Sequence, residues 1–213
     1  MKYTTYLFDF DGTLVDSMPA FVSVMLRILD EHHIPYGSDI VKIITPLGYA
    51  GTARYYISLG LDKSEETLRA MMNDYAMDEY LYHIPAKAHV IEVLHKLKEE
   101  GAGLNVLTAS PHSVLDPCLK RLGIYDIFDN VWSCDDFATT KADPEIYRMA
   151  ARRIGADVGE ILFLDDNYNA DKTAKETGMK VCGVFDESSS EYAEEIRAVS
   201  DHYINDFSEL LTL

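Results

Sequence analysis

The sequence predicts an α/β protein: a doubly wound parallel sheet with an all-helical unit inserted after its first strand. Three observations carry this prediction. An aromatic, apolar run at Tyr6–Phe10 is typical of a buried strand. Residues 17–83 show helical periodicity and no convincing strand. From Pro85 onward, short apolar strands alternate with single helices, as in parallel sheets. We therefore expect a sheet-containing core of residues 1–16 and 84–213, and a helical domain of residues 17–83.

Each element has its own signal. In the inserted unit, apolar residues between Phe21 and Leu29 recur at helical spacing, and a later helix begins at Ser64 with two glutamates after it. Asp16 and Ser17 are expected to end the first loop and cap the helix that follows. The segment 45–54, with two close glycines, is expected to be a loop. The later strands are predicted at residues 104–108, 131–134, 161–164 and 180–184, with a short helix and a final strand or loop near 202–206.

The helix after the third strand has the clearest start signal. Asp143 is placed to cap it, Pro144 stands at its first position, and Gly155 follows its last turn. The helix therefore separates the third and fourth strands, as a parallel arrangement requires.

Composition limits the partners. The 213 residues carry a formal charge of −17, which disfavours attraction to nucleic acid or an anionic membrane. The N-terminus lacks the apolar region of a signal peptide, and no run approaches membrane-spanning length. The three cysteines, Cys118, Cys134 and Cys182, show neither a disulfide nor a zinc pattern. We expect a cytoplasmic protein without nucleic-acid or membrane partners.

Polar side chains gather where the predicted strands end. Ligands of an open parallel sheet bind beyond the carboxyl ends of its strands. Any one of these residues alone fits a helix cap or a solvated loop, but four carboxylates converging on one face would repel one another unless a hard cation joined them. Oxygen ligands of this kind suit magnesium. The set comprises Asp9, Asp11, Thr108, Ser110, Lys141, Asp165 and Asp166.

The stretch "DFDGTLVDS", residues 9–17, resembles the first motif of the haloacid dehalogenase superfamily, in its phosphatase branch. The later motifs follow in that family's order, so the resemblance covers essentially the whole chain. It implies a Rossmann-like core with a helical cap at residues 17–83, as in phosphoglycolate phosphatases and β-phosphoglucomutases. It also implies a Mg²⁺ cofactor.

The resemblance implies a role for each matching residue. Asp9 would be the nucleophile that forms an aspartyl-phosphate, and Asp11 the general acid and base. Lys141 would offset charge on Asp9 and on the phosphoryl group. Metal ligands would be Asp9, the backbone carbonyl of Asp11, Asp166 and Asp165. The phosphoryl group would be bound by Thr108 with Ala109 and Ser110, and by Lys141.

The chain departs from the family pattern in four places, one of which is the segment "ADPEIY" after Lys141, where a proline commonly comes first. Ala109 stands where the family often has Asn, which removes a side-chain donor. Asp165 stands where many relatives have Gly. Ala170 replaces a frequent second acid, and Asp171 follows one residue later. Asp166 is accordingly the first choice as metal ligand in this motif, before Asp165 and Asp171.

These residues are compatible with two enzymatic functions. The first is a Mg²⁺-dependent phosphatase that acts on a small phosphorylated metabolite, as a monomer or homodimer. The second is a sugar phosphomutase, which would share the core residues and differ in the cap. Dehalogenation is disfavoured because metal-free halide displacement has no use for Asp11. A non-catalytic binding protein on this fold would be expected to lack the nucleophile or its partner, and both are present.

Overall fold

The computed structural model describes residues 3–44 and 47–213, and the chain divides into two compact units. The core unit comprises Met1–Asp16 and Pro85–Leu213, and the inserted unit comprises Ser17–Ile84. The chain therefore leaves the core unit once and returns once. Both crossings are short, and they lie beside each other because the N–H of Asp16 donates to the carbonyl of Pro85 at 3.0 Å.

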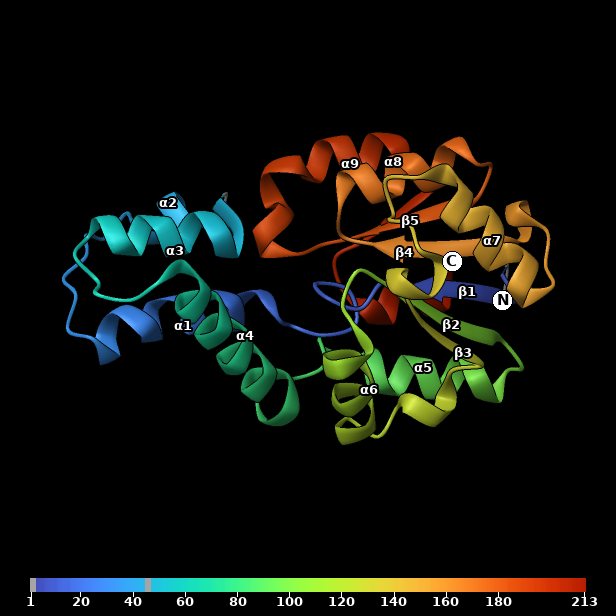
Figure 1. Cartoon of the computed structure of the whole chain (residues 1–213). Coiled ribbons are helices and arrows are strands. Elements are labelled where there is room, and N and C mark those ends of the chain that lie inside the picture. Colours follow the sequence, from blue (N-terminus) through green and yellow to red (C-terminus); the bar gives the residue numbers. More distant parts are fainter. Residues whose placement is uncertain (1–2, 45–46) are drawn as a thin grey trace. The chain divides into compact units, whose positions relative to one another are not determined.

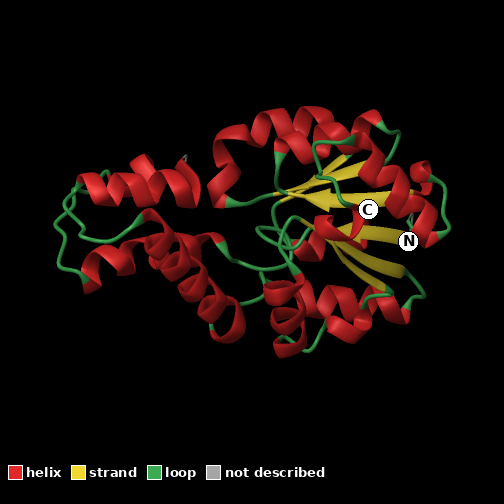
Figure 2. Ribbon diagram, viewed as in Figure 1, coloured by secondary structure: helices red, strands yellow, loops and turns green. Residues whose placement is uncertain are grey.

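The core unit contains the predicted parallel sheet (Figures 1 and 2). Its six strands lie in the order β3-β2-β1-β4-β5-β6, and every neighbouring pair is parallel. After β1 the chain adds strands on one side of it and then crosses to β4 on the other, so β1 and β4 flank the switch point. The strands are β1 (Thr5–Phe8), β2 (Gly103–Thr108), β3 (Asn130–Ser133), β4 (Ile161–Asp165), β5 (Lys180–Val184) and β6 (His202–Ile204).

Helices cover both faces of this sheet. Figure 1 shows α5 and α6 on one face, and α7, α8 and α9 on the other. The helices are α5 (Val90–Glu99), α6 (His112–Arg121), α7 (Pro144–Ile154), α8 (Tyr168–Glu176) and α9 (Ala193–Val199). Short 3-10 turns complete the unit: η2 (Tyr125–Ile127), η3 (Cys134–Phe137), η4 (Val158–Glu160), η5 (Glu187–Tyr192) and η6 (Phe207–Thr212).

Strands buried on both faces need apolar side chains throughout, which explains their continuous apolar runs. On one face Leu7, Phe163 and Val181 join a buried cluster with residues of α7 and α8. On the other face the ring of Phe8 lies 6.2 Å from that of Phe128 and 6.0 Å from that of Phe207. The buried Asn105 inside β2 is hydrogen-bonded, since its Nδ2 donates to the carbonyl of Tyr6, and the charged residues of the strands lie at strand ends.

The regular elements of the inserted unit, within the residues that the structure describes, are all helices. It contains α1 (Met18–Glu31), α2 (Ile40–Ile44), α3 (Gly48–Ser58) and α4 (Glu65–Tyr82). The predicted apolar positions from Val24 to Leu29 form part of its core with Leu68 and Met72. Ser64 caps α4 as predicted, since its side chain accepts the N–H of Thr67.

Two predictions for the inserted unit are wrong. The expected loop at 45–54 is helical from Gly48, because Ala53 and Tyr56 are buried in the core of this unit and hold the segment in α3. Positions 45 and 46 lie outside the described residues. Ser17 makes no capping hydrogen bond, because its backbone is helical rather than extended and Pro19, in the first turn, has no N–H to donate.

Several strand boundaries differ from the prediction by one or two residues, and two of the differences involve specific hydrogen bonds. The first strand ends at Phe8 rather than Phe10, although the N–H of Asp9 still donates to the carbonyl of Leu164 at 2.8 Å. The third strand ends at Ser133, and Cys134 begins η3 because Ser133 and Asp136 form a capping box there. The strand expected near the C-terminus is confirmed as β6.

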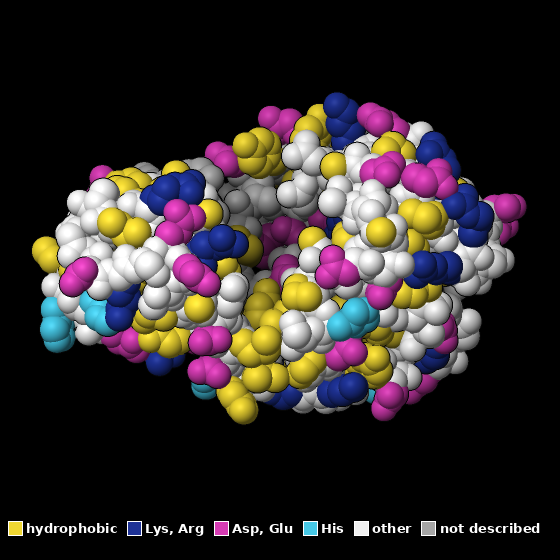
Figure 3. Space-filling view, viewed as in Figure 1, with side chains coloured by type: hydrophobic (Ala, Val, Ile, Leu, Met, Phe, Trp, Pro, Cys, Tyr) yellow, Lys and Arg dark blue, Asp and Glu magenta, His cyan; other side chains and the backbone are white. Residues whose placement is uncertain are grey.

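Charged side chains of both signs are scattered over the visible face of each unit (Figure 3). All three cysteines are buried and free of disulfides. In the described part of the chain, the helices are too short or too polar to cross a membrane.

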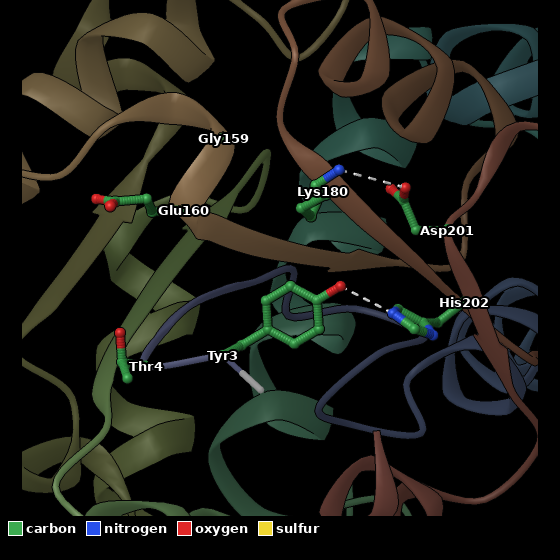
Figure 4. A pocket seen from close by; sticks show the side chains of 7 residues that line it. All are labelled: Tyr3, Thr4, Gly159, Glu160, Lys180, Asp201 and His202. Atoms are coloured by element: carbon green, nitrogen blue, oxygen red, sulfur yellow. Dashed lines mark hydrogen bonds and ion pairs between the residues drawn. The ribbon is translucent and has the colours of Figure 1, made fainter. Parts of the chain in front are cut away.

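A cavity of about 540 Å³ lies at the amino ends of the strands, away from the polar strand ends (Figure 4). In it the Tyr3 hydroxyl lies 2.8 Å from Nε2 of His202, and Lys180 faces Asp201. The first contact joins the N-terminal segment to the start of β6, and the second joins the start of β5 to the residue before β6.

Candidate active site

A cavity of about 400 Å³ lies at the carboxyl ends of β1, β2 and β4, next to the switch point of the sheet. Four segments that are distant in sequence supply its walls: the loops after these three strands and the loop before α7. Its lining comprises Asp9, Asp11, Thr108, Ala109, Thr140, Lys141, Ala142, Asp165, Asp166, Asn167, Asn169 and Ala170. Nearly every candidate residue from the sequence therefore borders one cavity. Ser110 is outside this lining.

Lys141 lies between two carboxylates on the cavity floor. Its ammonium contacts Oδ1 of Asp9 and lies 2.8 Å from Oδ2 of Asp165. The Lys141 side chain is only 14% exposed. Burial by itself would lower the pKa of this lysine, but the charges of Asp165 and Asp9 raise it. The ammonium is therefore held in its charged form against Asp9.

Asp9, Asp165 and Asp166 form the carboxylate cluster of the site. Each offers an oxygen that lies within 4.8 Å of the oxygens of the other two. Burial, with the neighbouring charge of Asp165, raises the pKa of Asp9 to about 7, and Lys141 opposes that rise. Burial and the charges of Asp165 and Asp9 also raise the pKa of Asp166 well above its usual range. One lysine does not balance two buried carboxylates and a third that is partly buried.

Asp166 is held by the loop that follows β1. The hydroxyl of Thr13 donates to its Oδ1 at 3.1 Å. Gly12 has a φ of +74°, and a Cβ at that position would lie 2.5 Å from Oδ2 of Asp166. The glycine in "DFDGT" therefore permits two things, a left-handed turn and close contact between the backbone and this carboxylate. The sequence had marked neither Gly12 nor Thr13 as a partner of Asp166.

Asp11 lies at the edge of the cavity with its carboxylate held by Ser110, whose hydroxyl donates to Oδ2 of Asp11. Thr108 is almost fully buried at the end of β2, and its Oγ1 accepts the N–H of Ser110 at 3.1 Å. In this structure Ser110 thus contacts the expected acid/base, while the resemblance had suggested it for the phosphoryl group. Ala109 lines the cavity between them.

Tyr147 on α7 joins two of the segments that line the cavity. Its hydroxyl lies 3.1 Å from the carbonyl oxygens of both Lys141 and Ala170, so it bonds the lysine loop to the start of α8. Its ring packs against Phe163 of β4 at 5.2 Å between centroids. Sequence reasoning missed this residue because a tyrosine at an apolar helix position indicates only core packing.

Asp171 does not belong to the carboxylate cluster. It is fully buried on α8, and neither carboxylate oxygen has a hydrogen-bond partner among the described residues. Burial, followed by the charges of Asp165 and Asp166, raises its pKa well above the usual range. We infer that Asp171 is neutral in the folded protein, which agrees with its last place among the metal candidates of this motif.

The donor set fits a hard divalent cation. Three carboxylates whose oxygens lie within 4.8 Å of one another repel strongly when ionised, and one ammonium then leaves a net negative site. Mg²⁺ prefers carboxylate and carbonyl oxygens and retains several of its waters, for which the adjoining cavity has room. Asp9 and Asp166 would hold the ion, with Asp165 beside them.

Comparison with known proteins agrees with the fold. A family model described as haloacid dehalogenase-like hydrolase matches residues 6–184. Pyrophosphatase PpaX of Bacillus velezensis is 30% identical over 186 residues, which cover 86% of this chain and 83% of the relative. A phosphoglycolate phosphatase of Salmonella paratyphi A is 28% identical over 203 residues, covering 83% and 79%.

Among solved structures, a candidate beta-phosphoglucomutase from Thermotoga maritima superimposes with a TM-score of 0.85. It is 21% identical and covers 98% of this chain and 96% of its own, so it shows a common fold. The family model spans the first strand, the inserted unit and all but the last strand of the sheet. This chain therefore belongs to the haloacid dehalogenase-like hydrolase family, among its phosphatases.

Proposed function

We propose that this enzyme is a Mg²⁺-dependent phosphohydrolase that removes phosphate from a small phosphorylated metabolite through an aspartyl-phosphate on Asp9. One observation carries the proposal: the Asp9 carboxylate contacts the Lys141 ammonium on the floor of a cavity that Asp11 and Thr108 also line. A nucleophile, a proton carrier and a fixed positive charge thus border a single space. Phosphoryl transfer requires this combination of positioning and charge.

In the first half of the reaction, an oxygen of Asp9 attacks phosphorus and the bond from phosphorus to the ester oxygen breaks. Asp11 gives its proton to the leaving oxygen. Lys141 offsets the charge that develops on the phosphoryl oxygens, and Thr108 offers its hydroxyl to one of them. The hydrogen bond from Ser110 holds the Asp11 carboxylate at the edge of the cavity between these events.

In the second half, Asp11 takes a proton from water, and the water oxygen attacks phosphorus as the bond to Asp9 breaks. Inorganic phosphate leaves, and both aspartates return to their starting states. A bound Mg²⁺ would supply positive charge to the carboxylate cluster and the phosphoryl oxygens. The same charge would favour the ionised, nucleophilic form of Asp9, whose pKa is raised in the metal-free site by burial and by the charge of Asp165.

The substrate class rests on charge and on the relatives. The net charge of −17 gives no general attraction for polyanions, so an anion must bind through Lys141, the cation and local amides. The relatives named above are a pyrophosphatase and a phosphoglycolate phosphatase. We propose phosphomonoesters of small metabolites as substrates, with the inserted helical unit as a cap domain that selects among them.

A phosphatase screen over metabolite phosphates, with and without Mg²⁺, tests this function. We expect phosphate release that depends on Mg²⁺ and is abolished in Asp9→Asn. Asp16→Asn is the matched control, because Asp16 belongs to the same segment but does not line the cavity. Activity that survives Asp9→Asn, or that ignores chelator, would contradict the mechanism.

The same screen distinguishes this function from the phosphomutase alternative. A mutase would isomerise a sugar phosphate after priming by a bisphosphate and release little phosphate from other esters. The likeness to a candidate mutase is one of fold at 21% identity and does not favour that reaction.

A further inference from the structure

Lys87 is a largely buried cation that the proposed reaction does not use. It lies in the segment by which the chain re-enters the core unit, three residues before α5. Its backbone is fixed against the loop after β1: the N–H of Lys87 donates to the carbonyl of Leu14 at 3.0 Å, and Ala86 forms a bridge with Val15. The side chain therefore starts from a rigid point beside the site.

The Lys87 ammonium has three close acceptors, one for each of its protons. It lies 2.6 Å from the carbonyl oxygen of Gly12, 2.7 Å from that of Phe185 and 2.9 Å from Oδ2 of Asp186. The side chains of Lys87 and Asp186 are 20% and 6% exposed. A fully bonded and mostly buried ion pair holds its partners in place far better than an exposed one.

These acceptors come from loops on either side of the strand that carries the metal candidates. Gly12 follows β1, and Phe185 with Asp186 follows β5. In the sheet, β4 lies between β1 and β5, and it ends at Asp165. Lys87 thus joins the two loops that flank the end of β4.

The Gly12 peptide that Lys87 holds is the one in contact with the Asp166 carboxylate. A Cβ on Gly12 would come within 2.7 Å of all three atoms of that carboxylate, and the next residue, Thr13, donates to it. A small shift of the Gly12 peptide would therefore move Asp166. Asp186 is anchored independently, since its Oδ1 accepts the N–H and hydroxyl of Ser188 at 3.0 and 2.6 Å.

We propose that Lys87 is a positioning residue for the cation site: through its hydrogen bond to the Gly12 carbonyl it fixes the place of Asp166, while Asp186 holds the ammonium in position. This inference rests on the proposed function. The expected change in Mg²⁺ affinity on removal of Lys87 is opposite in sign to the change that simple electrostatics predicts. Removing a positive charge near a cation site should tighten Mg²⁺ binding, whereas removing the group that positions a ligand should weaken it.

The test is Mg²⁺ binding by calorimetry to the full chain, with Lys87→Met, Asp186→Asn and a control. Lys175→Met is the control, because Lys175 also pairs with an aspartate, Asp201 at 2.6 Å, but at the amino end of the strands. We expect Lys87→Met to raise the Mg²⁺ dissociation constant about tenfold or more, the range of partners that orient metal ligands. Asp186→Asn keeps the lysine charge and should raise the constant by a smaller factor. Lys175→Met should leave it within about twofold.

Thermal unfolding of the metal-free variants shows whether each is folded. If Lys87→Met is not folded, Mg²⁺ binding by Asp186→Asn tests the positioning role instead. An unchanged or lower dissociation constant in folded Lys87→Met, beside normal binding and phosphate release by the unaltered enzyme, would overturn the positioning role alone. Failure of the unaltered protein to bind Mg²⁺ would overturn the proposed metal dependence, and this inference with it.

Discussion

Gly12→Ala is the substitution whose effect can be worked out most directly from the structure. The new Cβ would lie 2.5 Å from Oδ2 of Asp166, whereas ordinary contact begins at 3.4 Å. Because Lys87 and the N–H of Gly12, which donates to Val15, hold this peptide, the carboxylate must retreat by about 0.9 Å. Mg²⁺ demands near-ideal octahedral geometry, with bonds of about 2.0–2.1 Å, so a displaced ligand is largely lost.

A misplacement of this size is expected to cost about a hundredfold in activity at limiting Mg²⁺, or about 2.7 kcal/mol. The backbone contributes separately, since a non-glycine residue at positive φ costs about 1–2 kcal/mol of stability. Gly123→Ala separates the two effects. Gly123 has the same φ of +74°, and a Cβ there would meet nothing within 4 Å.

The assays are urea unfolding of the metal-free proteins, phosphate release at limiting Mg²⁺ and calorimetric titration with Mg²⁺. Both alanine variants should lose similar backbone stability, and only Gly12→Ala should bind Mg²⁺ more weakly. Equal Mg²⁺ affinity in the two variants would refute the contact between Gly12 and Asp166 as the reason for this glycine.

Three further predictions follow from buried polar groups. Ser110→Ala removes the hydrogen bond that holds the Asp11 carboxylate and should lower kcat about tenfold, while Ser110→Thr restores most of it; steady-state kinetics that show no loss would contradict this role. Tyr147→Phe should lower the free energy of unfolding by about 1 kcal/mol, measured in urea, because the carbonyls of Lys141 and Ala170 lose a shared donor. Asp171 has a raised pKa in the folded state, so folding takes up a proton and its contribution to stability falls as pH rises above the unfolded pKa. Between pH 5 and pH 8 the unaltered chain should therefore lose more stability than Asp171→Asn, and equal losses would show that Asp171 is not neutral in the fold.

The fold was predictable because its signals are local. Alternating strands and helices identify a parallel sheet, and Asp143 with Pro144 marks the start of α7 as predicted. The errors came where tertiary packing overrides a local signal. Gly48 and Gly51 indicate a loop, but the burial of Ala53 and Tyr56 holds the segment as a helix.

For the site, too, residues with a local sequence signal were predictable and residues defined by long-range contacts were not. Carboxylates at strand ends can be recognised from sequence, since parallel strands bring their carboxyl ends to one edge. The supporting contacts cannot, because they join positions far apart in the chain. Lys87 reaches Asp186, 99 residues away, and Thr13 reaches Asp166, 153 residues away. Nothing in the residues near Lys87 or Thr13 indicates these partners.

Turnover should phosphorylate Asp9, and chemical trapping of this acyl phosphate detects the intermediate directly. An acyl phosphate is reduced by borohydride to an alcohol, so acid-quenched enzyme treated in this way should contain homoserine at position 9, detected by peptide mass spectrometry. We predict that this product forms only with substrate and Mg²⁺ present, and that it is absent from Asp9→Asn. Steady phosphate release with unmodified aspartate at position 9 in every quenched sample would contradict the aspartyl-phosphate mechanism.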